Sequence, residues 1–141
     1  MFKEIFAEVK EAKKLAAEAR AADIIRQREA RIAKTNEFFG EVKEDLVEKI
    51  SDIFREAASK IFPPNDIEVN LNGVEYNDEE NYILRNGKYL TIHTKLSPIE
   101  FSFRKIAENI KALFDADGLR NSVDDSMFAV NVAHFHVRLP A

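Results

Sequence analysis

The sequence predicts an α+β protein in which a long helix or a helical hairpin precedes a small antiparallel sheet of three or four strands, covered by one helix. Residues 1–62 contain no proline and repeat apolar side chains every three or four residues, which is helical spacing. After Pro63 and Pro64 the apolar period falls to two, which is strand spacing. The predicted order is α-α-β-β-β-α-β, with a helical arm over residues 1–62 and an α+β domain over residues 63–141.

Two apolar stripes run along the predicted helical region. They consist of Phe2, Ile5, Val9, Ala12, Ala16 and Ala19, and of Phe39, Val42, Leu46, Ile50, Ile53, Ala57 and Ile61. Thr35-Asn36 can cap a helix and Gly40 weakens one, so we expect a break near residues 35–40. A single helix is the alternative, because isoleucine, phenylalanine or leucine recurs every seven residues from Ile25 to Ile53.

This helical region carries more apolar surface than a small sheet can cover, so we expect it to bind other copies of the chain. The expected oligomer or partner face consists of Ile5, Val9, Ala16, Ile25, Ile32, Phe39 and Leu46. Residues 1–34 contain nine basic and six acidic side chains, whereas residues 35–62 contain four and seven. In a single rod, this dipolar charge pattern would favour head-to-tail association.

The strands follow from alternation and from turn residues. Apolar residues alternate over 67–71 before Asn72-Gly73, which predicts a strand and a turn. An acidic loop is expected over 77–81. Asn86-Gly87 between two apolar runs predicts a hairpin over residues 82–95, because this dipeptide favours the tight turn that joins antiparallel strands.

A second helix and a last strand complete the predicted domain. The segment Ser97-Pro98-Ile99-Glu100 has the form of a capping box, so we expect a helix to begin there and to end near Gly118. A polar loop over 121–125 then leads to a strand over 127–139 that is rich in valine and phenylalanine.

All three histidines lie on predicted strands, on the face opposite the expected core. The candidate ligand-binding face consists of Tyr89, His93, Lys95, His134, His136 and Arg138. The three histidines have the ligand chemistry of a zinc site with an open fourth position. Arginine, lysine and histidine side chains could instead bind an anionic ligand such as a nucleotide, with Tyr89 stacking on a base. A solvated face or a dimer contact is the third interpretation, and we expect neither a bound metal nor a cofactor.

Composition excludes several classes of protein. Hydrophobic residues make up 45% and charged residues 33%, with only 4 Gly and 4 Pro, which is typical of a folded, helix-rich chain. The absence of cysteine excludes a disulfide scaffold, a thiolate metal site and a cysteine nucleophile. The net charge of −4 disfavours direct binding to nucleic acid. The N-terminus has no signal-peptide pattern and no apolar run could cross a membrane, so we expect a cytoplasmic protein.

Residues 86–97, running into the predicted helix over 101–113, resemble the strand–helix half of a phage-encoded anti-CRISPR family that inhibits Cas9. This resemblance implies a small non-enzymatic inhibitor made by a phage or prophage. The chain departs from that family at its N-terminus, where a disordered arginine-rich segment is replaced by a helical arm of balanced charge. The resemblance therefore implies no contact with guide RNA and assigns no functional residue.

The sequence thus predicts a non-enzymatic, self-associating binding protein of the host-cell cytoplasm, with no membrane contact. Its partner is expected to be a host protein or an anionic small ligand such as a nucleotide, which it would block or sequester as an anti-defence factor. The common phosphate-binding and hydrolase motifs are absent from the sequence, so we expect no catalytic residue. A histidine-dependent metalloenzyme or nuclease, and a virion structural or assembly protein, are the alternatives.

Overall fold

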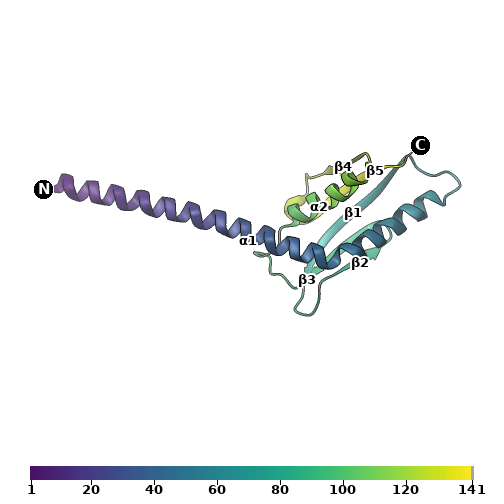
Figure 1. The fold of residues 1–141 in the computed structure, drawn as a ribbon, viewed down its shortest axis with the longest axis horizontal. Coiled ribbons are helices and arrows are strands. Elements are labelled where there is room, and N and C mark those ends of the chain that lie inside the picture. The colour runs from purple at the N-terminus through teal and green to yellow at the C-terminus, as the bar shows by residue number, and fades with distance from the viewer. Residues whose placement is uncertain (141) are drawn as a thin grey trace.

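A computed structural model describes residues 1–140 as a long helix that projects from one end of a small α+β domain (Figure 1). The elements are α1 (Phe2–Ala58), β1 (Asp66–Tyr76), β2 (Tyr82–Asn86), β3 (Tyr89–Thr94), α2 (Phe103–Ala116), β4 (Asn121–Asp124), a short 3-10 helix (Phe128–Val130) and β5 (Val132–Arg138). The α+β class is confirmed. The order is α-β-β-β-α-β-β, because one helix replaces the expected pair and a strand precedes the last one.

The expected break near residues 35–40 is wrong, because α1 continues through it. The Thr35 hydroxyl donates to the carbonyl of Arg31 at 2.7 Å and accepts the backbone N–H of Ser102 at 2.9 Å, so it bonds across the fold instead of capping a helix. Gly40 inside a helix costs about 1 kcal/mol relative to alanine. Burial of the neighbouring Phe38 and Val42 contributes about 1.5–3 kcal/mol each, which outweighs that cost.

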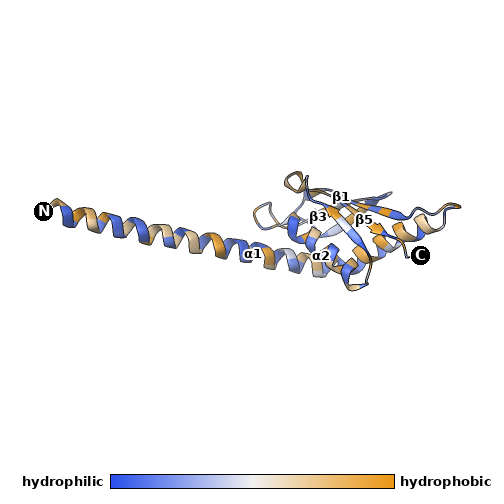
Figure 2. Ribbon diagram, turned by 90° about the horizontal axis from the view of Figure 1, so that it is seen from above, coloured by the Kyte–Doolittle hydropathy of each residue, from blue (hydrophilic) through white to orange (hydrophobic). Residues whose placement is uncertain are grey.

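The exposure of α1 changes sharply at Thr35. Every residue before it is exposed, so residues 2–34, here called the arm, form a projecting helix that spans about 50 Å at the 1.5 Å rise per residue and contacts the domain only near its base. Hydrophobic and hydrophilic residues alternate along the ribbon of the arm (Figure 2). From Thr35 onward the helix buries one face, which consists of Phe38, Val42, Leu46, Ile50, Ile53 and Ala57. The second half of α1 therefore packs into the α+β domain.

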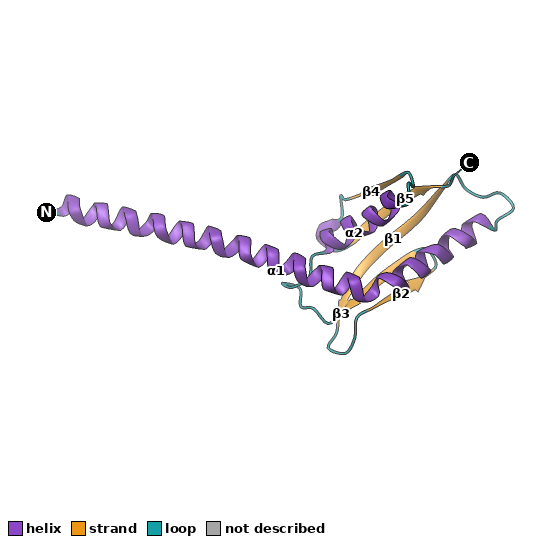
Figure 3. Cartoon of the chain, viewed as in Figure 1, coloured by secondary structure: helices purple, strands orange, loops and turns teal. Residues whose placement is uncertain are grey.

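Five strands form one mixed sheet in the order β2-β3-β1-β5-β4 (Figure 3). Only β1 and β3 run parallel, and the other neighbours are antiparallel. The second half of α1 and α2 lie on the same face of the sheet (Figure 2). The opposite face, here called the open face, carries no helix in the described chain.

The two Asn-Gly dipeptides adopt different structures, a hairpin turn and a β-bulge. Asn86-Gly87 forms the predicted hairpin turn between β2 and β3, with Gly87 at φ +61°. Asn72-Gly73 does not end a strand. Gly73 has a φ of +96° within a bulge of β1, between the pairs Leu71–Leu90 and Val74–Ile92. At the bulge β1 stops pairing with β5, whose last partner is Asn72, and continues to pair with β3 over residues 74–76.

The predicted helix start at Ser97 and the predicted loop over 121–125 are both wrong, because these segments contact α1 and β5. The predicted helix start at Ser97 forms a turn in which its N–H donates to the Glu100 carboxylate at 3.0 Å. The helix begins only at Phe103, because Phe101 is buried and its carbonyl bonds to α1. Residues 121–124, expected to be a loop, form β4 by pairing with the edge of β5.

The buried face of α1 supplies the first prediction. Leu46 is 1% exposed, whereas the adjacent Val47 is 42% exposed. Replacing Leu46 with alanine should lower the free energy of unfolding by about 2–5 kcal/mol, because it leaves a cavity beneath the helix. Urea denaturation measures this loss. Val47→Ala is the control and should change stability by less than about 0.5 kcal/mol, and equal effects of the two variants would contradict the packing described.

Candidate functional site

The arm exposes a stripe of apolar side chains to solvent. The stripe consists of Phe2, Ile5, Val9, Ala12, Ala16 and Ala19, and the exposed Phe6 and Leu15 lie along its sides. The exposed fraction is 66% for Phe2 and 71% for Phe6. Burial of a large aromatic side chain would be favourable, so this stripe is an apolar surface that the described residues leave uncovered.

The structure divides the expected oligomer face at Thr35. Five of its residues are exposed on the arm: Ile5, Val9, Ala16, Ile25 and Ile32. The other two are not available to a partner chain. Leu46 is fully buried against the sheet of its own chain, and Phe39 packs against the same core.

Polar contacts at the base of the arm, here called the elbow, fix its direction. The Arg31 guanidinium donates to the carbonyls of Phe101 at 2.7 Å and Pro98 at 3.2 Å. The Lys34 ammonium forms an ion pair with the Glu100 carboxylate. Its hydrogen bond, together with those from Ser97, lowers the pKa of Glu100 from 4.5 to about 2. The elbow therefore joins the arm to the segment between β3 and α2.

On the open face, register brings four of the six predicted ligand residues alongside the first half of β1. Tyr89 of β3 and His134 of β5 lie opposite Asn70, one on each side. His136 lies opposite Glu68. Arg138 lies opposite Asp66 at the start of the strand.

The other two predicted residues lie toward the far end of the sheet. His93 pairs with Glu75, five residues along β1 from Asn70, which corresponds to about 17 Å of strand. Its ring stacks on Tyr82 at 4.3 Å between centroids. Lys95 lies beyond β3, and its backbone N–H donates to Asn81. The six residues therefore do not form one cluster, because four lie along the first half of β1 and two lie toward its far end.

The separation of His93 from the other two histidines weakens the zinc interpretation. His134 and His136 share one strand, but His93 lies several rows away. In residues 1–140, no group of three or more histidine, aspartate, glutamate or cysteine side chains is arranged to hold a metal ion. The sequence-based zinc site thus has no third histidine within reach.

Polar partners surround the histidines on β5. Nδ1 of His134 lies 2.6 Å from Oδ1 of Asn70, which is only 2% exposed, so the ring donates to the amide oxygen. The Lys88 ammonium lowers the pKa of Glu68, and His136 contributes to this shift. A backbone hydrogen bond from Ser126 lowers the pKa of Asp124, which lies opposite His134 on β4. These polar groups of the open face are thus held by interactions within the chain.

Sequence reasoning did not select Glu68, Asn70 or Asp124. The signal for the first two was present, because alternation of Ile67, Val69 and Leu71 into the core places the intervening residues on the opposite face. The sequence offers no comparable signal for Asp124, because its segment reads as a polar loop and forms a strand only by pairing with β5.

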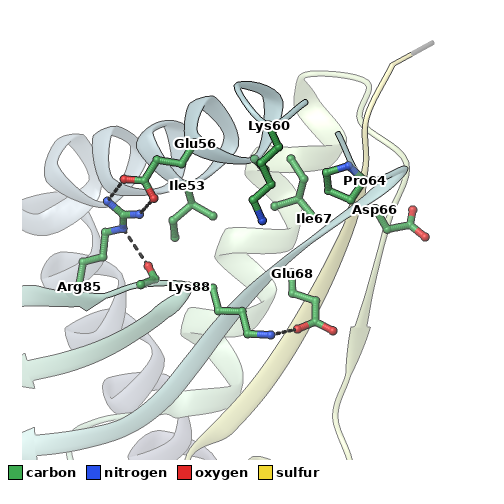
Figure 4. A pocket seen from close by; sticks show the side chains of 11 residues that line it. Ile53, Glu56, Lys60, Pro64, Asp66, Ile67, Glu68, Arg85 and Lys88 are labelled. Atoms are coloured by element: carbon green, nitrogen blue, oxygen red, sulfur yellow. Dashed lines mark hydrogen bonds and ion pairs between the residues drawn. The ribbon is translucent and has the colours of Figure 1, made fainter. Parts of the chain in front are cut away.

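A first hollow lies between the C-terminal end of α1 and the β2–β3 turn (Figure 4). It has a volume of about 450 Å³, and three acidic and three basic side chains line it. Glu56 forms a two-pronged ion pair with Arg85, and Glu68 pairs with Lys88. Hydrogen bonds from Arg85 lower the pKa of Glu56. Since its charges balance, this hollow has little net attraction for a charged ligand.

A second hollow, of about 720 Å³, has a different charge. It is lined by Arg120 and Arg138 with the segment 63–65 and contains no acidic side chain. The backbone N–H of Arg138 donates to the carbonyl of Arg120 at 2.8 Å, which holds the two residues side by side. Two arginines in a lining without an acidic residue suit an anion, although Asp66 lies opposite Arg138 on β1. We call this hollow the arginine hollow.

Comparison with protein-family models, with curated proteins and with solved structures finds no significant match to this chain. Among residues 1–140, no helix combines the length and the apolar character that a membrane-spanning segment requires.

The elbow supplies the second prediction. Glu100→Gln should lower the melting temperature at pH 7, because it removes the ion pair with Lys34. The folded pKa of Glu100 lies below its ordinary value of 4.5, so its contribution is complete above that pH and is lost as the pH falls toward about 2. Thermal unfolding across this pH range should show the difference between wild type and variant disappearing near pH 2. Glu37→Gln is the control, and a difference independent of pH would contradict the assignment.

Proposed function

We propose that this protein is a non-enzymatic, self-associating binding protein that blocks or sequesters a host component. The arm would join copies of the chain, and the open face with the arginine hollow would recognise the partner. The observation that carries the proposal is the exposed stripe on a helix that leaves its own domain's core at Thr35.

The energetics of a free helix favour association. Packing of an apolar face provides most of the stability of helices in proteins, and the stripe of the arm is not packed against its own domain. Full burial of a side chain such as Phe2, Ile5 or Val9 contributes about 1.5–3 kcal/mol. Pairing of two arms would bury these side chains and stabilise the helix at the same time, with no rearrangement of the α+β domain.

Two features support recognition of an anionic ligand or of an acidic surface on a host protein. The arginine hollow is lined by two arginines and by no acidic residue. His136 and Tyr89 are exposed on the neighbouring open face, and the Lys88 ammonium lies 5.9 Å from the Tyr89 ring centroid. The anti-defence role, with a Cas9-type effector as one class of host protein, remains the proposal that the sequence resemblance contributes.

The third prediction concerns the arm. Ile5→Glu with Val9→Glu should convert an oligomer into a monomer at micromolar concentration, because it places charges in the stripe. Light scattering coupled to size-exclusion chromatography measures the mass. Ala7→Glu with Ala21→Glu adds the same charge on the opposite side of the helix and should leave the mass unchanged. A wild-type protein that is strictly monomeric would refute self-association.

The fourth prediction concerns recognition. Arg120→Ala with Arg138→Ala should weaken binding of a nucleoside triphosphate, or of the host protein retained from lysate, at least tenfold. Each charged hydrogen bond contributes about 1.5–3 kcal/mol, and about 1.4 kcal/mol is a factor of ten. Titration calorimetry measures the affinity. Lys43→Ala with Arg55→Ala removes equal charge from α1 and should have no effect. If the arginine variant binds as tightly as wild type, the hollow is not the recognition site.

A further inference from the structure

The stripe on the arm has a gradient of side-chain size. Its first three residues, Phe2, Ile5 and Val9, are large, and its last three are the alanines 12, 16 and 19. The whole stripe is exposed, and no other part of residues 1–140 covers it. Any second helix that packs here must therefore accommodate bulky side chains at one end and small side chains at the other.

We infer that the partner of each arm is the arm of a second copy, paired antiparallel over residues 2–19. In this register Phe2 lies against the partner's Ala19, Ile5 against the partner's Ala16 and Val9 against the partner's Ala12. Each layer then combines one large and one small side chain, so two straight helices keep a constant separation. This inference rests on the proposed self-association and specifies its geometry.

A parallel pair would pack less well. Phe2 would lie against the partner's Phe2, and Ala19 against the partner's Ala19. The separation of helix axes depends on the side chains between them and varies over about 8–10 Å. Rigid helices could then touch well at the phenylalanine end or at the alanine end, but not at both.

The charges beyond the stripe also favour the antiparallel register. The next positions on the same side of α1 are Asp23 and Arg26, which form an ion pair within the arm at 3.4 Å. A parallel pair that continued past Ala19 would place Asp23 against the partner's Asp23 and Arg26 against the partner's Arg26. In the antiparallel register the partner helix ends before Asp23, so both side chains remain in water.

The residues that flank the stripe are compatible with this pairing. Phe6 would lie beside the partner's Lys13, whose ammonium can rest on the aromatic ring. Glu8 would lie beside the partner's Leu15, so no like charges meet. Residues 1–20 contain five basic and four acidic side chains, which leaves the paired segment close to neutral.

The antiparallel register also separates the two domains. Each N-terminus would end beside Arg20 of its partner, about 22 Å before the domain begins at Thr35. The two Thr35 residues would lie about 70 Å apart at a rise of 1.5 Å per residue. The dimer would be a dumbbell with an open face at each end, able to hold two partner molecules.

Disulfide trapping tests the register, because the chain contains no cysteine of its own. Ile5→Cys and Ala16→Cys are made in separate chains, one of them isotopically labelled, then mixed and oxidised gently. The antiparallel register predicts a mixed disulfide between the two variants and little cross-linking of either alone, because a disulfide requires Cα atoms within about 7 Å. Ala7→Cys mixed with Lys14→Cys, on the opposite side of the arm, is the control and should not cross-link.

Each outcome supports or overturns a defined claim. Cross-linking of Ile5→Cys to itself, or a dimer without the mixed disulfide, overturns the antiparallel register while leaving self-association intact. A monomeric wild type overturns both. X-ray scattering of the unmodified protein provides a second measurement, and a dimer whose domains lie side by side, rather than about 70 Å apart, would also overturn the register.

Discussion

Burial of one continuous face of α1 against the sheet is the interaction on which the rest of the structure depends. This face extends from Phe38 to Ala57 and contributes six buried apolar side chains to the core. Because an α-helix is stiff over this length, fixing residues 35–58 also fixes the direction of the residues that precede them. The arm therefore projects as a continuation of a packed helix and not as a flexible leader.

The elbow also fixes the orientation of the arm relative to the α+β domain. Backbone carbonyls at Pro98 and Phe101 and the N–H of Ser102 all bond to side chains of α1. These groups belong to the connection between β3 and α2, which would otherwise need water or its own residues to satisfy them. The arm, the covering helices and the open face are thus parts of one body, so association through the arm would set the positions of the recognition surfaces.

Much of the fold follows from local rules. The change of apolar period at Pro63-Pro64 separated helix from sheet correctly, and Asn86-Gly87 marked the hairpin. The errors occurred where a residue with a strong local preference has a distant partner. Thr35 bonds to Ser102, and β4 exists only because β5 offers it an edge. The candidate site shows the same division, since alternation placed the histidines on strands but could not supply the register that separates His93 from His134.

By itself, the sequence determined the class of fold, the apolar stripes and the types of side chain available for binding, because these depend on spacing along the chain. Only the tertiary structure decided which stripe is buried and which remains in solvent. The physical reason is that the second half of α1 and α2 already fill the covered face of the sheet, which leaves no apolar surface there for the earlier stripe. The sheet covers α1 after Thr35 and leaves the earlier stripe exposed.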